Sequence, residues 1–325
     1  MAYQIKPYAD ENFCEWNAFL ATAKNGTFLF HRNFIGYHGN RFEEASLLFY
    51  DGDLLVAIFP ANRQGDTVFS HQGLSYGGLV VQPNIRLQDY LDIFSTLLAY
   101  WATRGVEKVR IKNLPPIYVN APTAELEYIC FLTDAKIVRT DMLLVVDNRT
   151  DLPLTTNRKR SIAKGFKEDF YVEENNDFAS FWQQVLVPNL KAKHGITPVH
   201  SLEEIELLHR KFPREIRQFN LYTPQGELVA GVTVFETDTV AHLQYISGLP
   251  AWNERGAIDW LHHYLMEVPF KEKAFFDFGS CNEQEGRKLN KGLLYWKEGF
   301  GARAVAQHFY EIETKCFNKL QDLWI

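Results

Sequence analysis

The sequence predicts an α/β protein made of two tandem, related domains, each a mixed and mostly antiparallel sheet flanked by helices. Three observations indicate this class. The chain has 325 residues, more than a single hydrophobic core usually takes. Strand-like and helix-like apolar patterns alternate along it. The order of these patterns in the first half returns in the second half. The composition, 46% apolar and 23% charged, is that of an ordinary globular protein.

Two hairpins are the clearest copies of the repeat. Segments 48–59 and 221–235 each read as a strand, a tight turn and a second strand. Gly52 and Gly226 lie in the turns, where glycine accepts a positive φ, and they are 174 positions apart (226 − 52). A second turn, 65–68, recurs at 237–240, and each copy leads into a strand with a glycine-rich exit.

A helix with an apolar stripe follows in each half. The stripe residues are Leu87, Tyr90, Leu91, Phe94, Leu97 and Leu98 in the first copy, and Ile258, Leu261 and Leu265 in the second. A strand (106–114 or 273–279), a short helix and closing strands complete each copy. Two unrelated domains that share common hairpins are the alternative, but the ordered series of matches favours duplication. The polar, proline-containing stretch 147–153 predicts a boundary between domains 1–148 and 149–325.

Composition limits the classes of function. The net charge of −6 argues against a generally basic nucleic-acid-binding surface. The chain start has no apolar signal-peptide core, and no run approaches the roughly 18 apolar residues of a membrane span. Its four cysteines are far apart and form no C-x-x-C pair, which argues against zinc or a disulfide framework. We therefore expect a cytoplasmic protein without a metal. Attachment to the inner membrane surface stays open, and the sequence is silent on oligomeric state.

The most informative motif lies in segment 275–305. It contains Asp277-Phe-Gly279, a polar loop, and then Gly292-Leu-Leu-Tyr-Trp-Lys297-Glu-Gly-Phe-Gly301. This motif and the order of elements resemble the GNAT N-acyltransferase fold, in a tandem form similar to the Fem-type branch. The resemblance implies a site where two neighbouring parallel strands splay apart to bind acyl-CoA. Fem-type proteins are peptidoglycan aminoacyltransferases and their acetyltransferase-like relatives.

The same resemblance implies roles for two residues near the end of this motif. Tyr295 matches a tyrosine that protonates the departing thiolate in many GNAT enzymes, which a phenol of pKa about 10 does as charge develops. Tyr128 occupies the same place in the first copy, which favours a packing role for both. Lys297 matches a family lysine that contacts phosphates or a polar acyl donor. The alternative for Lys297 is a cation that favours the C-terminal end of its helix dipole.

One family motif is poorly matched. CoA-binding GNAT proteins usually carry [Q/R]-x-x-G-x-[G/A] where a helix starts, so that backbone amides approach the pyrophosphate. Asn253, Arg255 and Gly256 occupy the equivalent stretch, with Asn in place of Gln or Arg. Asn253 is a good helix cap and Arg255 is cationic, so an anion remains a reasonable ligand here. The alternative is that Gly256 serves tight packing between a helix and a strand.

A basic stretch opens the second domain. Segment 157–167 has five basic residues and no acid, and Arg160, Lys164 and Lys167 fall on one helical face. It resembles the basic helix of Fem-like proteins, and a phosphate-bearing ligand such as CoA, a nucleotide-linked precursor or tRNA would fit it. A solvated basic face is the alternative.

The general base is harder to name. Asp277 ends a buried strand, where desolvation raises a carboxyl pKa, and His242 lies on the central hairpin. In the first domain, Ser75 and Tyr76 lie in the glycine-rich loop at the matching place, which we expect to contact the acceptor. Each has a structural alternative.

Three readings of the function follow. The first is a cytoplasmic N-acyltransferase that moves an acyl group, such as acetyl, from acyl-CoA to a small-molecule or peptide amine. The second keeps the fold but takes the acyl group from aminoacyl-tRNA, with a cell-wall precursor as acceptor. The third is a non-catalytic duplicated scaffold that binds a metabolite.

Overall fold

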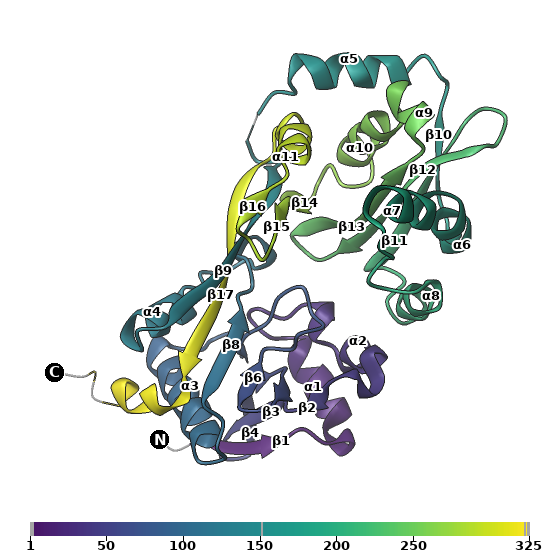
Figure 1. The fold of residues 1–325 in the computed structure, drawn as a ribbon. Helices are drawn as coiled ribbons and strands as arrows, with labels where there is room; N and C mark the ends of the chain where they lie inside the picture. Colours follow the sequence, from purple (N-terminus) through teal and green to yellow (C-terminus); the bar gives the residue numbers. More distant parts are fainter. Residues whose placement is uncertain (1–2, 151, 322, 324–325) are drawn as a thin grey trace. The chain divides into compact units, whose positions relative to one another are not determined.

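The computed structural model describes residues 3–150, 152–321 and 323 (Figure 1). They form two compact units. Unit 1 is Met1–Asp141 together with Ala306–Ile325, and unit 2 is Met142–Val305. The predicted domains, 1–148 and 149–325, differ from these units in two places. The division between units follows Asp141, and the chain from Ala306 onward belongs with unit 1.

Unit 1 holds two groups of hydrogen-bonded strands. One has the order β1-β3-β4-β7 and is antiparallel throughout. The other has the order β17-β8-β6-β5-β2, in which only β6 and β8 run parallel. The strands are β1 (Gln4–Pro7), β2 (Glu43–Glu44), β3 (Leu47–Asp51), β4 (Leu54–Phe59), β5 (Asn62–Gln64), β6 (Thr67–Phe69), β7 (Val80–Val81), β8 (Lys108–Lys112) and β17 (Arg303–Glu313).

Helices cover the strands of unit 1. The predicted apolar stripe of the first copy forms α3 (Leu87–Ala102), whose Leu91, Phe94 and Leu98 are buried in the core. Its other α-helices are α1 (Phe13–Leu20), α2 (Arg32–Ile35) and α4 (Glu125–Leu132), and its 3-10 helices are η1 (Asp10–Asn12), η2 (Phe28–Phe30), η3 (Gly36–Arg41), η4 (Pro116–Tyr118) and η6 (Thr314–Leu320). Leu320 of η6 is buried in the same core as α3, so the end of the chain is part of this unit.

Unit 2 is built on a six-stranded order, β10-β11-β12-β13-β14-β9. All neighbours are antiparallel except β13 and β14, which run parallel. The strands are β9 (Lys136–Asp147), β10 (Tyr171–Glu174), β11 (Ile216–Tyr222), β12 (Leu228–Glu236), β13 (Val240–Gly248) and β14 (Phe275–Ser280), and β15 (Asn282–Glu283) pairs with β16 (Lys288–Leu289).

The helices of unit 2 include two that matter for the site. The apolar stripe of the second copy forms α10 (Ala257–Glu267), whose Leu261 and Leu265 pack with Phe276 in the core. The basic stretch forms α5 (Thr156–Gly165), which lies across α9, α10 and α11 (Figure 1). The others are α6 (Phe178–Ser180), the π-helix η5 (Phe181–Leu186), α7 (Val187–His194), α8 (Leu202–Lys211), α9 (Pro250–Glu254) and α11 (Lys291–Glu298).

The two copies exchange their closing strands. By the repeat, β9 belongs to the first copy and β17 to the second. In the structure β9 pairs with β14 of unit 2, from Val145 opposite Asp277 to Asp147 opposite Phe275. β17 pairs with β8 of unit 1, from Phe309 opposite Lys112 onward. Each unit therefore depends on a strand supplied by the other half of the sequence.

Local predictions hold elsewhere. Gly52 and Gly226 have positive φ in the two hairpin turns, as expected of tight turns that need glycine. In the parts of the chain that the structure describes, no helix is both long and apolar enough to cross a bilayer.

Candidate active site

The candidate site of unit 2 begins where two parallel strands separate. β13 and β14 pair at only three positions, and the last is His242 opposite Asp277. Beyond it β13 follows β12 as far as Gly248, whereas β14 keeps to β9. A β-bulge at Gln244 helps β13 turn away, because the extra residue bends the strand that carries it. The sheet is therefore open past His242, as the family resemblance implied.

His242 and Asp277 form a hydrogen-bonded pair at this apex. Nδ1 of His242 lies 2.8 Å from Oδ2 of Asp277. Phe276 and Phe278 point into the core with α10, so the alternation of a strand turns Asp277 to the opposite face. Asp277 is fully buried, and its other oxygen accepts a bond of 2.7 Å from the amide of Gly279. When Nδ1 of His242 is the donor of this bond, Nε2 is the ring nitrogen that is left to accept a proton. The histidine is 19% exposed, so a ligand can reach it.

Lys297 fixes the backbone that follows Asp277. Its Nζ donates to the carbonyls of Gly279 (2.9 Å) and Ser280 (2.8 Å). Gly279 has φ of +70°, a conformation that favours glycine. Lys297 is 3% exposed, and burial lowers its pKa to about 8. The lysine is thus a buried side chain that holds the backbone at the end of β14, rather than an exposed cation at the end of its own helix.

Trp296 forms one wall of the opening, and a network absent from the sequence-based predictions orients it. Its Nε1 donates to Oδ1 of Asp259 at 2.7 Å, and Arg158 of α5 forms an ion pair with the other oxygen of Asp259. The indole also meets Phe278 and His262 edge to face, with ring centroids 5.5 and 4.9 Å apart. The spacing of Arg158 and Asp259, 101 positions apart (259 − 158), gives no local signal that they meet.

A pocket of about 280 Å³ lies further along the opening. Its apolar wall consists of Leu190, Ile246, Ile258, Leu293 and Trp296. Its polar residues are Asn189, Lys193, Ser247, Gly248 and Asn253. Asn189 of α7 donates to Ser247 Oγ (2.8 Å) and to the carbonyl of Gly248 (3.0 Å), which holds α7 against the end of β13. A concave, mostly apolar pocket with a few fixed polar groups is typical of a small-molecule site.

The structure corrects the prediction that Asn253 caps a helix. Asn253 lies inside α9 and donates to the carbonyl of Gly248 at 2.8 Å, and the residue that caps α10 is Gly256, at φ +92°. A Cβ on Gly256 would lie 2.2 Å from the carbonyl oxygen of Ser161 on α5. The glycine therefore allows close packing of two helices, rather than of a helix on a strand. Arg255 forms an ion pair with Glu168 and lies 4.4 Å over the ring of Trp252.

The remaining residues predicted in unit 2 lie outside the pocket wall. Tyr295 is 56% exposed, and its hydroxyl accepts a bond of 2.7 Å from Asn157 of α5. Its counterpart in unit 1, Tyr128, is 44% exposed and stacks on Phe131, with ring centroids 6.5 Å apart. Arg160 and Lys164 are exposed on α5, and Nζ of Lys164 donates to the carbonyl of Glu254 at 3.1 Å. Their roles in binding and catalysis stay predictions.

Unit 1 lacks the histidine–aspartate pair. Through the repeat offsets, Ser70 and Ile111 occupy the places of His242 and Asp277. Ser70 instead accepts from the amide of Lys112 through its hydroxyl at 3.0 Å. Tyr76 is buried and donates to the hydroxyl of Thr27, and the carbonyl of Ser75 accepts from Gln307. These contacts are structural, and acceptor binding by Ser75 and Tyr76 stays a prediction.

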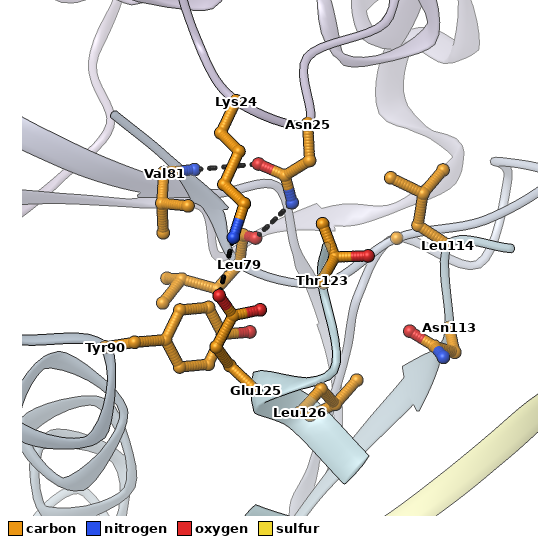
Figure 2. Close-up of a pocket in the computed structure, with 12 residues that line it drawn as sticks. Lys24, Asn25, Leu79, Val81, Tyr90, Asn113, Leu114, Thr123, Glu125 and Leu126 are labelled. Atoms are coloured by element: carbon orange, nitrogen blue, oxygen red, sulfur yellow. Dashed lines mark hydrogen bonds and ion pairs between the residues drawn. The ribbon is translucent and has the colours of Figure 1, made fainter. Parts of the chain in front are cut away.

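The cleft of unit 1 that corresponds to the pocket is nearly closed. Its cavity is about 30 Å³ (Figure 2). Lys24 reaches across it to Glu125 at the start of α4, with Nζ 2.5 Å from the carboxylate. Asn25 binds the backbone on both sides of Val80, donating to the carbonyl of Leu79 and accepting from the amide of Val81 (Figure 2). Polar side chains of unit 1 thus fill the space that stays open in unit 2.

Comparisons with known proteins agree with this architecture. Residues 155–286 match the family described as acetyltransferase (GNAT) domain. No curated protein matches the chain. The crystal structure of FemX has a TM-score of 0.68 at 9% identity, covering 98% of this chain and 99% of that one. L-PGS from Bacillus licheniformis has a TM-score of 0.59 at 13% identity, covering 95% and 92%. A conserved protein from Bacteroides thetaiotaomicron has a TM-score of 0.58 at 10% identity, covering 95% and 99%.

These observations define a class. The protein has two tandem units in which one pair of parallel strands splays open, and residues 155–286 of it match the acetyltransferase (GNAT) domain family. Its tandem arrangement is of the Fem-like type. Among the described residues, no group of three or more His, Cys, Asp or Glu side chains is placed to hold a metal ion.

Proposed function

We propose that unit 2 acylates an amine at the apex between β13 and β14, with His242 as general base and Asp277 as the group that positions it. The observation that carries the proposal is the hydrogen-bonded His242–Asp277 pair at the last register before the strands separate. An ammonium ion must lose a proton before its nitrogen attacks a carbonyl, and a partly exposed imidazole with Nε2 available accepts that proton.

In the proposed reaction, the amine nitrogen forms a bond to the acyl carbon and its proton passes to Nε2 of His242. The carbon–sulfur bond of a thioester donor then breaks, and the thiolate takes up a proton as it leaves. Asp277 holds the imidazole in one tautomer and stabilises the imidazolium that forms. Lys297 keeps the Gly279–Ser280 backbone in place behind Asp277. Unit 1 has Ile111 in place of this aspartate, which supports a single reaction centre.

Acetyl-CoA is the simplest donor for a first assay, because a GNAT domain generally uses acyl-CoA. The protein is incubated with acetyl-CoA and a panel of amines that includes amino sugars, amino acids and short peptides. Amide products are detected by mass spectrometry and free thiol is measured in parallel. His242→Gln and Asp277→Asn are expected to lower kcat by roughly 10²–10⁴-fold.

His263→Gln serves as the matched control, because it makes the same change at a histidine of α10, away from the His242–Asp277 pair. It should keep the parent rate. If His242→Gln and Asp277→Asn fold and turn over as fast as the parent, the base assignment is wrong. If no amine in the panel is acylated by any donor, the scaffold reading replaces the enzymatic one.

A second candidate donor is aminoacyl-tRNA, with a cell-wall precursor as acceptor. The exposed cations of α5 and the fold shared with FemX favour it. Charged tRNA is therefore included in the assay with the same acceptors. Transfer of the aminoacyl group alone, with none from acetyl-CoA, would select this candidate.

A further inference from the structure

The distance between the pocket and the His242–Asp277 pair constrains the donor, if the proposed reaction is correct. The pocket is lined by Ile246, Ser247 and Gly248, which lie four to six positions beyond His242 on β13 (246 − 242 and 248 − 242). At about 3.3 Å per residue, with one residue in a bulge, the separation is roughly 10–20 Å. A donor anchored in the pocket reaches the base only if its acyl group is carried on a long, narrow arm.

The anchor for free CoA is missing from the expected place. The amides of Arg255 and Gly256 donate to the carbonyls of Trp252 and Asn253, both at 3.0 Å, so the stretch is wound onto the end of α9. In CoA-binding relatives the matching amides face the pyrophosphate. Here Gly256 turns instead against Ser161 of α5, and the guanidinium of Arg255 is engaged with Glu168. At this place the amides of Arg255 and Gly256 and the guanidinium of Arg255 are therefore already engaged within the protein, and they offer a CoA pyrophosphate no unpaired donor.

Helix α5 contacts two of the helices that line this pocket, and it presents a basic surface. It contacts α9 through Lys164 and α11 through Asn157, and both of those helices supply residues to the pocket wall. The basic surface consists of the exposed side chains Lys159, Arg160, Lys164 and Lys167. Within the described part of the chain, no ion pair joins any of the four to a carboxylate. Phe166, 59% exposed, adds an apolar centre to this surface.

From these features we propose that the acyl donor is an acidic carrier protein that bears the acyl group as a thioester on a phosphopantetheine arm. The carrier docks on the basic surface of α5, its arm passes through the pocket between β13 and α11, and the thioester reaches His242. Nitrogen–carbon bond formation expels the carrier's own thiolate, which takes up a proton. Opposite charges steer the two proteins together, and Phe166 supplies the apolar contact of a protein interface.

Charged tRNA fits the same surface by charge, and its single-stranded 3′ end also spans this distance. That end carries one phosphate per nucleotide, whereas the pocket wall is mostly apolar and its lining includes a single cation, Lys193. The observations therefore favour the carrier protein, and tRNA becomes an outcome of the test.

The test compares four donors with one acceptor, the amine that gives most product in the panel above. The donors are an acidic acyl carrier protein loaded with acetyl, acetyl-CoA, acetyl-pantetheine and charged tRNA. We expect kcat/KM for the loaded carrier protein to exceed that for acetyl-CoA by roughly tenfold or more, and to fall as salt rises. A Lys159→Glu, Arg160→Glu, Lys167→Glu variant should lose that advantage yet keep the parent kcat/KM for acetyl-pantetheine.

The matched control replaces three exposed cations elsewhere on unit 2, Lys211, Arg214 and Lys271, with glutamate. It should leave kcat/KM for all four donors unchanged. Any of three results would overturn the proposal. They are equal kcat/KM values for acetyl-CoA and the loaded carrier protein, an unchanged kcat/KM for the carrier protein in the basic-surface variant, and transfer from charged tRNA alone. Failure of the proposed function itself looks different, because then acetyl-pantetheine also yields no amide.

Discussion

Gly256→Ala tests the packing of α5 against α10. At φ of +92° an alanine pays roughly 1–2 kcal/mol of backbone strain relative to glycine. Its Cβ would lie 2.2 Å from the carbonyl oxygen of Ser161 and 2.9 Å from the amide nitrogen of Gly165, so α5 must move, at about 1–3 kcal/mol. Alanine also restricts the unfolded chain, which returns about 0.4–1 kcal/mol. The expected net loss is about 2–4 kcal/mol in the free energy of unfolding of unit 2.

Urea unfolding measures the loss, and hydrogen exchange resolved to peptides of α5 and α10 shows where it arises. Gly292→Ala in α11 is the matched control, because a Cβ there has its nearest neighbour at 3.7 Å and φ is not positive. It should be neutral or stabilise by up to about 1 kcal/mol. The close approach of Gly256 to Ser161 would be refuted if Gly256→Ala were as stable as the parent. It would also be refuted if hydrogen exchange changed only outside α5 and α10.

Three further predictions concern single side chains. Burial lowers the pKa of His262 to about 4, so the unfolded state binds a proton before the folded state does as pH falls. Between pH 6.5 and 4 the parent should therefore lose about 3 kcal/mol more of its free energy of unfolding than His262→Leu loses. Equal losses in the two proteins, measured by acid unfolding, would contradict this. Lys24→Met leaves the Glu125 carboxylate without its cation and should lower the free energy of unfolding of unit 1 by about 2 kcal/mol. Adding Glu125→Gln should restore most of this loss. A double-mutant cycle that shows no coupling between the two changes would disprove the pairing. Tyr295→Phe should keep kcat within about threefold because its hydroxyl binds Asn157, whereas a loss of roughly 10²-fold would support the acid role that the sequence predicts.

Local chemistry in the sequence predicted much of the fold. The hairpin turns at Gly52 and Gly226 and the apolar stripes of α3 and α10 all formed as expected. These signals depend on residues a few positions apart, which is the range over which turn geometry and helical periodicity act. The same range explains an error. Asn253 has the chemistry of a helix cap, but Gly256 has the left-handed conformation that the junction with α5 requires.

The candidate site was predicted only in part, for the same reason. His242 and Asp277 were both singled out as candidates for the general base, but their pairing depends on the parallel register of β13 and β14. Arg158 and Asp259 were missed, because an ion pair between distant segments leaves no pattern in the sequence. Lys297 was matched to a ligand-binding lysine, yet its buried amine holds two backbone carbonyls.

The sequence by itself predicted the fold class and the repeated order of elements, because tight turns and apolar periodicity depend on residues that are close together in the chain. Only the tertiary structure decided which strand closes which unit. β9 and β17 are copies of one strand pattern, so either could pair with β8 or β14 by local preference alone. Their exchange is settled by long-range packing, in which Tyr310 and Ile312 fill the core of unit 1 while Leu144 and Val146 fill that of unit 2. Only the tertiary structure likewise shows that the cleft of unit 2 is open, whereas Lys24 and Glu125 pair across the cleft of unit 1.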